Sequence, residues 1–460
     1  MSHRHFGKLA ALALAIAMVF GAGSAGADAR IGSALATQLA TALPLQQLEI
    51  VVTYKQSGPP QAAQIQALRA LGVTRGISFR AVPIVGALAT PGAINQIARR
   101  ADVLSIHANS ALTYSNNDAR RLSGVDALQA DPNYGYTGAG VAVMVNDSGI
   151  DATHADLAFG SHVVENVQAL TNLSSILTFL PVTYLEGQQD TDVSSGHGTH
   201  CAGIVGGSGT QSGSLYRGVA TDAALVGYGS GAVISVLDAV GGFDYAIANR
   251  TRFASPIRVI SNSWGTSGAF DPTDPVNVAS YAAYKQGIVS VFAAGNDGPA
   301  ANTHNPYAQA PWVISVAAGN KDGTLADFSS RGNPGESGTF TMPDGQTWTY
   351  YNQPTLVATG VDIVSTRALT GLLPVLAVGQ DASLGPAVLP YYTHMSGTSM
   401  ATPHVAGIVA LLFEANPSLT PALVKSILAA TANPMPGRAA FEVGAGHVDA
   451  YEAGAVASGH

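Results

Sequence analysis

Apolar residues along most of the chain gather in short, nearly continuous runs that stop abruptly at glycine or polar residues. Runs rich in Val, Ile and Ala are typical of strands buried on both faces, because a strand with one solvated face alternates apolar and polar positions. Segments with helical spacing lie between the runs. We therefore predict an α/β fold with a parallel sheet flanked by helices on both faces. The predicted strands are GVAVMVND (140–147), AALVGYG (223–229), RVISNSWG (258–265), IVSVFAAGN (288–296) and WVISVAAG (312–319).

The intervening helical segments are fewer and longer than the strands. Their apolar residues recur at the three- and four-residue spacing of a helix with one buried face. The predicted helices are THCAGIVGG (199–207), a segment within 280–287, PHVAGIVALLFEA (403–415) and PALVKSILAATA (421–432).

Residues 46–107 follow a different order, strand–helix–strand–strand–helix–strand, which predicts a small α+β domain of the ferredoxin-like, split βαβ kind. Gly72 ends its first helix and Pro91 begins its second. The polar stretch TYSNNDARRLSG (113–124) after this unit is typical of a linker. Farther along, PDG (343–345) predicts a hairpin inside a loop-rich region, 332–390.

The N-terminal residues have the pattern of an export signal. The polar, basic MSHRHFGK precedes 15 apolar residues, and SAGADA then offers small residues for cleavage after Ala27 or Ala29. A membrane anchor is the alternative, but the run is shorter than the ~20 residues that span a bilayer. We therefore expect residues 1–29 to be a signal peptide, and no later segment to span a membrane.

Composition narrows the function classes. The chain of 460 residues carries a net charge of −8 without any basic block, so we expect no nucleic-acid partner. Its one cysteine, Cys201, excludes an intramolecular disulfide.

Three predicted strands end in residues able to do chemistry. The first ends at Asp147, the third runs through Ser263 to Gly265, and the fourth ends at Asn296. Each alone could be an ordinary turn residue. In an open parallel sheet, however, ligands bind beyond the carboxyl ends of the strands, so together these residues indicate a single functional face.

His197 lies between two glycines in GHGTHCAG, just before a helical segment. Flanking glycines indicate a backbone that approaches other groups closely. A metal site with His200 and Cys201 is an alternative, but the sequence lacks the Glu of the HExxH motif and a convincing third ligand. We predict no metal at these residues.

The stretch MSGTSMATPHVAG (395–407) holds four hydroxyls. Pro403 requires that a helix begin within about one turn before it, which puts Thr398 or Ser399 at the helix N-terminus. There a serine could be a simple N-cap. With Asp147 and His197 on the same face, Ser399 instead completes a set of nucleophile, base and orienting acid, because serine needs a base to take its proton. Ser396, Thr398 and Thr402 are left with turn and capping roles, and His404 lies within the helix.

These motifs resemble those of the subtilisin-like serine proteases, peptidase family S8. VMVNDSGIDATHADL resembles the aspartate motif, GHGTHCAG the histidine motif, AAGN the oxyanion motif and SGTSMATPHVAG the serine motif, in the family's order. The resemblance implies that Asp147 orients the base, His197 is the base, Ser399 is the nucleophile and Asn296 stabilises the oxyanion. The cysteine after the second histidine is closer to the proteinase K-like branch.

The resemblance also implies substrate-binding residues and a cofactor question. Ser263, Trp264 and Gly265 would line one wall of the pocket for the side chain before the scissile bond, and Gly229 would lie on the opposing strand. No cofactor is required. Structural calcium is common in the family and Asp156 matches one ligand position, but GGSGTQSGSLYRG (206–218) lacks the expected oxygen-rich loop.

Residues 46–114 resemble, more weakly, the inhibitory propeptide of the family. The implied organisation is a signal peptide (1–29), a propeptide (30–114) and a catalytic domain (115–460). The implied protein is a secreted, extracellular serine endopeptidase of broad specificity that acts on polypeptides through an acyl-enzyme. Its propeptide would serve as intramolecular inhibitor and chaperone, and we expect a monomer.

Two departures from the family pattern leave alternatives open. Segment 165–187, between Asp147 and His197, is an insertion, and region 332–390 is expanded; both could shape substrate access. A processing protease of narrow specificity is one alternative. A binding protein on an inactive protease fold is another, which the presence of all four catalytic residue types disfavours.

Overall fold

The computed structural model describes residues 29–109, 113–114, 120–370, 381 and 384–459, so the predicted signal peptide lies almost wholly outside the described residues. Its central element is an eight-stranded sheet in the order β10-β8-β11-β7-β12-β14-β15-β18. All neighbours in this sheet run parallel except β10, which is antiparallel to β8. The strands are β7 (Ala142–Asp147), β8 (Val163–Leu170), β10 (Thr183–Leu185), β11 (Ala224–Gly229), β12 (Ile257–Asn262), β14 (Val289–Ala293), β15 (Ile314–Gly319) and β18 (Leu356–Thr359).

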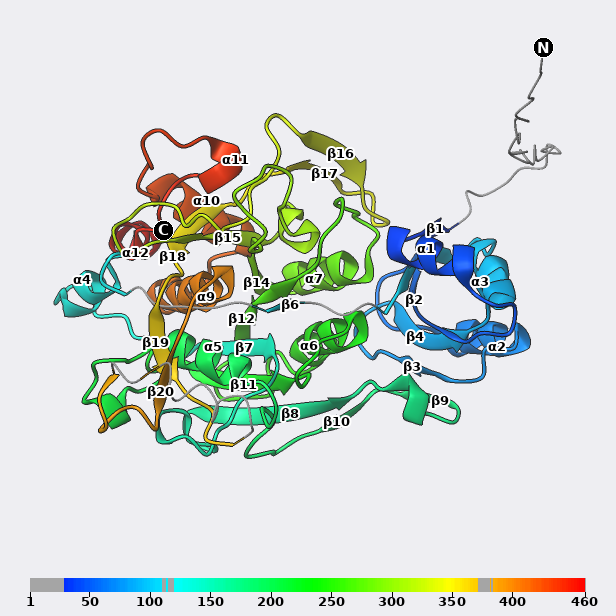
Figure 1. Ribbon diagram of the computed structural model, residues 1–460, viewed down its shortest axis with the longest axis horizontal. Helices are drawn as coiled ribbons and strands as arrows, with labels where there is room; N and C mark the ends of the chain where they lie inside the picture. Colours follow the sequence, from blue (N-terminus) through cyan, green and yellow to red (C-terminus); the bar gives the residue numbers. More distant parts are fainter. Residues whose placement is uncertain (1–28, 110–112, 115–119, 371–380, 382–383, 460) are drawn as a thin grey trace, which may run out of the picture.

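Helices cover both faces of this sheet, which confirms the predicted fold class (Figure 1). Val143 and Val145 of β7 pack toward one layer of helices, and Ala142 and Met144 pack toward the other. Because both sets are buried, the strand is a continuous apolar run in the sequence. The first layer holds α4 (Val125–Ala130), α5 (His197–Gly206), α9 (Thr398–Ala415), α10 (Pro421–Thr431) and α12 (Ala450–Ser458), and the second holds α6 (Val236–Ala248) and α7 (Pro275–Lys285).

Helix α6 is absent from the sequence-based prediction. Gly241 and Gly242 lie at its centre, and glycine lowers helix propensity. The structure explains both glycines: a Cβ on Gly241 would lie 2.0 Å from the Tyr228 hydroxyl, and one on Gly242 would lie 2.3 Å from the Asn146 side chain. The helix packs so closely on the sheet that tertiary contact, rather than propensity, decides its conformation.

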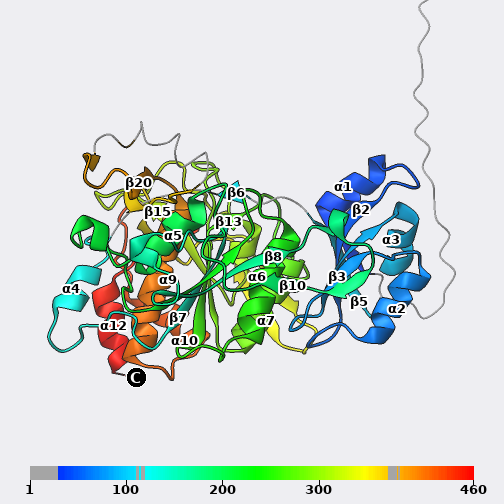
Figure 2. The ribbon, with the colours of Figure 1, turned by 90° about the horizontal axis from the view of Figure 1, so that it is seen from below.

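The N-terminal unit has the predicted strand–helix–strand–strand–helix–strand order and a hydrophobic core of its own. Two short elements that the sequence analysis did not predict, β1 (Arg30–Ile31) and α1 (Ser33–Thr41), precede it. Figures 1 and 2 show the unit beside α6 and α7, on the side away from α9. Its elements are β2 (Leu48–Tyr54), α2 (Ala62–Ala70), β3 (Gly76–Ser78), β4 (Ile84–Ala89), α3 (Pro91–Ala98) and β5 (Val103–Ala108).

Two segments behave differently from expectation. The start of the predicted linker forms β6 (Thr113–Tyr114), which pairs antiparallel with β13 (Trp264–Gly265), so this part is held against the main body. The insertion at 165–187 contributes β9 (Phe179–Pro181), which joins the sheet of the N-terminal unit in the order β1-β5-β2-β4-β3-β9. Pairing between strands distant in sequence depends on which edges meet, and local periodicity does not report it.

The predicted hairpin around 343–345 is present as β16 (Ser337–Thr341) and β17 (Thr347–Tyr351). Its Trp348 ring packs edge-on against Tyr284 of α7 and against Trp312. The remaining elements are β19 (Ile363–Thr366), β20 (Tyr392–Met395) and α11 (Ala440–Val443). Among the helices that the structure describes, none is both long enough and apolar enough to cross a bilayer.

Substitution Gly242→Ala tests the close packing of α6. We expect it to destabilise the chain by about 2 kcal/mol, because the new methyl group must displace Asn146 in a packed interior. Thermal unfolding followed by circular dichroism in a Ser399→Ala background measures the change. Gly92→Ala in α3 is the control, since its Cβ meets nothing within 4 Å; an equal loss in both variants would contradict this account.

Candidate active site

The three residues of the predicted nucleophilic set come from three elements whose ends meet at one edge of the sheet. Asp147 is the last residue of β7, His197 is the first of α5, and Ser399 is the second of α9. All three side chains are buried. Helices α5 and α9 pack side by side against the same face of the sheet (Figure 1).

Asp147 and His197 form a direct, short contact. The imidazole Nδ1 lies 2.6 Å from the Asp147 Oδ1, and the backbone N–H of Ser148 donates to the same oxygen at 2.7 Å. Gly198, the glycine after His197, makes the close backbone approach that the sequence predicted. A Cβ at this position would lie 2.1 Å from the Gly149 carbonyl oxygen. The contact fixes the proton on Nδ1 and leaves Nε2 as the basic nitrogen.

The electrostatics of His197 follow from this contact. Burial lowers the pKa of the imidazole, but the Asp147 carboxylate outweighs burial and raises the pKa well above its ordinary value. A carboxylate in this place therefore stabilises the imidazolium that forms when the base accepts a proton.

Cys201 contacts the His197 ring and the backbone of Ser399. Its Sγ is 3.8 Å from His197 Nδ1 and 3.6 Å from the carbonyl oxygen of Ser399. Burial raises the pKa of this thiol, which keeps it neutral. Asp147, His197 and Cys201 place three possible ligand atoms within 4.8 Å of one another, whereas His200 turns away, its Nε2 3.1 Å from the Thr393 carbonyl. The sequence argued against a metal site formed by His197, His200 and Cys201. In the structure the third residue close to His197 and Cys201 is Asp147, not His200.

Ser399 sits in the first turn of α9, as the position of Pro403 predicted. Its hydroxyl donates to the Ser263 carbonyl at 2.7 Å, and the Ser263 hydroxyl donates back to the Ser399 carbonyl at 2.8 Å. This reciprocal pair ties the serine turn to the end of β12. The start of a helix is the positive end of its dipole, which favours negative charge beside this hydroxyl.

Asn296, just beyond β14, is oriented by the residue before Ser399. Its Oδ1 accepts hydrogen bonds from the Thr398 backbone N–H at 2.9 Å and from the Thr398 hydroxyl at 3.1 Å. With Oδ1 so engaged, the amide Nδ2 is left to donate outward. Thr398 is thus a positioning residue, beyond the turn and capping role predicted for it.

The predicted substrate-binding residues present their backbone rather than their side chains. The Trp264 ring is buried against Phe292 and Tyr307, and its indole N–H donates to the Asn146 carbonyl at 2.7 Å. A Cβ on Gly265 would lie 2.4 Å from the Asn305 side chain. Gly229 ends β11, and its carbonyl accepts from the Gln168 side chain at 3.1 Å. Trp264 and Gly265 form β13, which pairs antiparallel with Tyr114 and Thr113 of β6.

Hydrogen-bond donors of the chain engage both carboxylate oxygens of Asp156. The Tyr392 hydroxyl donates to its Oδ2, and its Oδ1 accepts from the Gln211 backbone N–H at 3.1 Å and the Ser208 hydroxyl at 3.3 Å. A calcium ion at this carboxylate would have to compete with these donors, and the Gln211 N–H group cannot itself be a calcium ligand.

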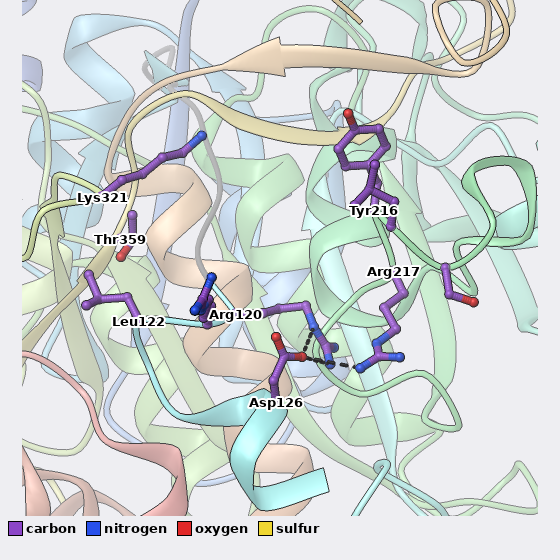
Figure 3. A pocket seen from close by; sticks show the side chains of 10 residues that line it. Arg120, Leu122, Asp126, Tyr216, Arg217, Lys321 and Thr359 are labelled. Carbon is purple, nitrogen blue, oxygen red and sulfur yellow. Dashed lines mark hydrogen bonds and ion pairs between the residues drawn. The ribbon is translucent and has the colours of Figure 1, made fainter. Parts of the chain in front are cut away.

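One large cavity lies apart from the predicted nucleophilic set. It has a volume of 820 Å³ and its wall includes Arg120, Asp126, Arg217 and Lys321 (Figure 3). Asp126 pairs there with Arg120 at 2.7 Å and with Arg217 at 3.3 Å. The cavity wall holds none of the nucleophile, base and orienting acid.

Comparison with known proteins decides the family. The Peptidase S8 subtilase family matches residues 138–446. The chain belongs to the subtilase family. Serine protease AprX of Bacillus subtilis is 32% identical over 375 residues, covering 76% of this chain and 74% of AprX. Subtilisin E of the same organism is 32% identical over 307 residues, covering 65% of this chain and 62% of that protein.

Solved structures agree on the fold of this subtilase. Fervidolysin from Fervidobacterium pennivorans has a TM-score of 0.62 at 21% identity, with 93% of this chain covering 63% of that one. Sphericase has a TM-score of 0.51 at 27% identity, over 71% of this chain and 97% of its own. The chain is therefore a subtilisin-like serine endopeptidase. Its place in the proteinase K-like branch stays a prediction.

The pH dependence of this subtilase should report His197. We expect activity to require the neutral imidazole, so kcat/KM should fall as pH drops through the raised pKa of His197. Asp147→Asn removes the group that raises the pKa, so the acid limb should move to lower pH while kcat falls about 10⁴-fold, as in other triads. Hydrolysis of a small peptide substrate across pH measures both. An acid limb that stays in place in Asp147→Asn would contradict the assigned cause.

Substitutions around Asn296 should separate oxyanion stabilisation from its positioning. We expect Asn296→Ala to lower kcat by about 10²–10³-fold with little change in KM, the range found for one oxyanion donor in subtilisin. Thr398→Val keeps the backbone N–H but loses the hydroxyl contact, so kcat should fall about tenfold, the value of one hydrogen bond. Thr398→Ser is the matched control and should retain activity; equal kcat in Val and Ser variants would refute the positioning role.

Proposed function

We propose that this subtilase is a secreted endopeptidase made as an autoinhibited precursor, in which residues 30–114 are the propeptide and 115–460 the catalytic domain. One observation carries the proposal: Thr113 and Tyr114 pair as an antiparallel strand with Gly265 and Trp264. Ser263 directly precedes Trp264, and its carbonyl oxygen accepts a hydrogen bond from the Ser399 hydroxyl. The end of the N-terminal unit thus occupies an edge on which an extended substrate would lie beside the nucleophile.

In the proposed reaction, His197 Nε2 takes the proton of the Ser399 hydroxyl while Oγ attacks the scissile carbonyl carbon. Asn296 Nδ2 donates to the oxyanion, and Asp147 stabilises the imidazolium. The imidazolium then gives its proton to the leaving amine, which leaves an acyl-enzyme. Water, deprotonated by the same histidine, attacks the acyl carbon. The bond to Ser399 Oγ then breaks, the imidazolium returns its proton to Oγ, and the carboxylic acid leaves.

Contacts between the N-terminal unit and the second helix layer support an inhibitory position. The Asn109 side chain accepts the backbone N–H of Leu237, in the first turn of α6, at 2.9 Å. The Asp244 carboxylate of α6 accepts the backbone N–H groups of Arg80 and Ala81 at 2.8 and 2.6 Å. These contacts near both ends of α6 hold the N-terminal unit against the second helix layer.

Histidine and carboxylates join the unit to α7. His107 Nδ1 lies 3.1 Å from Asp274 and its Nε2 3.6 Å from Asp271, which also pairs with Arg30 at 2.6 Å. Burial lowers the pKa of His107, but the two aspartates raise it above its ordinary value overall. The bound unit therefore carries charge complementary to the acidic start of α7.

Export follows from the predicted signal at residues 1–29, and one relative, the minor extracellular protease Epr of Bacillus subtilis, is extracellular by name. Epr is 28% identical, and the chain spans 45% of its length. We propose extracellular polypeptides as substrates, the propeptide as inhibitor and folding chaperone, and a monomeric enzyme without a nucleic-acid partner. A backbone-paired substrate favours broad specificity, because main-chain bonds tolerate varied side chains.

Comparison of the full chain with its Ser399→Ala variant tests the proposal. We expect the purified wild-type chain to cut itself near residue 114 and to react with a fluorophosphonate probe, because Ser399 is the activated nucleophile. Ser399→Ala should stay a single unlabelled chain. Equal labelling of the two, or a wild-type chain that never releases the fragment, would contradict it. Cleavage of an unbiased peptide library then distinguishes broad from narrow specificity.

A further inference from the structure

The inserted segment carries a feature that the catalytic chemistry does not use. Between β8 and β10, residues 171–182 leave the main sheet; we call this segment the arm. Its strand β9 pairs parallel with β3 of the N-terminal unit, Phe179 opposite Gly76 and Pro181 opposite Ser78. The arm returns to the main sheet at Thr183, which pairs with Leu170. Figure 1 shows β9 beside the N-terminal unit, at the far end of β8 and β10.

Phe179 fills a place in the core of the N-terminal unit. Its side chain is buried among apolar residues of that unit, such as Leu68. The Arg69 guanidinium lies over the ring at 5.7 Å from its centre. A Cβ on Gly76 would lie 2.4 Å from the ring, so the unit has a bare backbone where the ring rests. The arm thus completes a core that belongs to another part of the molecule.

Arg75 of the N-terminal unit fastens the base of the arm. Its guanidinium donates to the carbonyl oxygens of Ile176, Ser174 and Leu173 at 2.5, 2.7 and 3.2 Å. A planar guanidinium can satisfy several acceptors at once, which a lysine cannot do. Farther along, the Val182 backbone N–H donates to the Ser78 carbonyl at 3.1 Å. Side-chain and backbone bonds therefore tie the arm along its length.

We propose that the arm is a docking strand for the propeptide, and that its grip sets how long the cleaved propeptide stays bound as an inhibitor. This rests on the proposed function. The arm contributes no residue to the catalytic set, so its contacts stabilise the complex without entering the reaction. Cutting the chain near residue 114 leaves the β3–β9 pairing and the Phe179 site intact. Release of the inhibitor must break them.

Two readouts test the docking strand on the full chain. In a Ser399→Ala background, hydrogen exchange of the β3 amides reports local opening. We expect Phe179→Ala and Arg75→Ala each to speed this exchange about tenfold, the effect of losing one good hydrogen bond or more. Leu177→Ala is the matched control on the arm, because this side chain is 88% exposed. Arg75→Lys keeps the charge and should behave like Arg75→Ala, since it loses the multiple contacts.

In the active chain, the second readout is the lag before hydrolysis of a small peptide substrate begins. We expect Phe179→Ala and Arg75→Ala to shorten the lag several-fold and to reduce co-elution of the 30–114 fragment with the enzyme. The final kcat/KM should equal that of the wild type. Unchanged exchange and an unchanged lag in both variants would overturn the proposal. If the wild-type chain forms no fragment, the precursor function fails, while the exchange readout still judges the docking strand.

Discussion

The active site depends on one buried helix. Every residue of α9 from Thr398 to Phe413 is buried, and the helix packs against α5, α12 and the main sheet. A helix that is apolar on all sides has no freedom to slide, because any shift would break packing around its whole circumference. Its first turn is therefore fixed relative to the strand ends. Ser399 lies in that first turn, so the packing of about four buried helical turns holds it in position.

Charge then separates the base from the other histidines. Burial is the main reason that the pKa falls to about 3 for His200 and His404 and to about 4 for His304, so these side chains are neutral structural groups. His197 is as deeply buried, but it faces a carboxylate, and its pKa moves the other way. His197 and His200 lie three residues apart on the same helix. The one that faces a carboxylate can accept a proton, and the other is a neutral, packed imidazole.

The sequence predicted those features of the site that depend on neighbouring residues along the chain. Strand ends, glycine-flanked His197 and the place of Pro403 are local signals, and the elements and the ends at which the residues lie agree with them. Helix α6 was missed because its two glycines are explained by close contacts with Tyr228 and Asn146, which lie on strands that precede the helix in the chain. The role of Thr398 was missed because its partner, Asn296, lies 102 positions away. Pairings such as β3 with β9 depend on which edges meet in space, and no periodicity encodes that.

Two strand additions with different chemistry hold the N-terminal unit. Beside Ser263, Thr113 and Tyr114 pair with β13 through backbone hydrogen bonds. The ring of Trp264 packs into the core against Phe292. Pairing through the backbone distinguishes little among the side chains of the paired segment. At the arm, Phe179 enters a preformed core and Arg75 binds three carbonyls, so side chains add selectivity there. Under the proposed function, an enzyme of broad specificity would hold its own inhibitor selectively through surfaces away from β13, and the insertion offers such a surface.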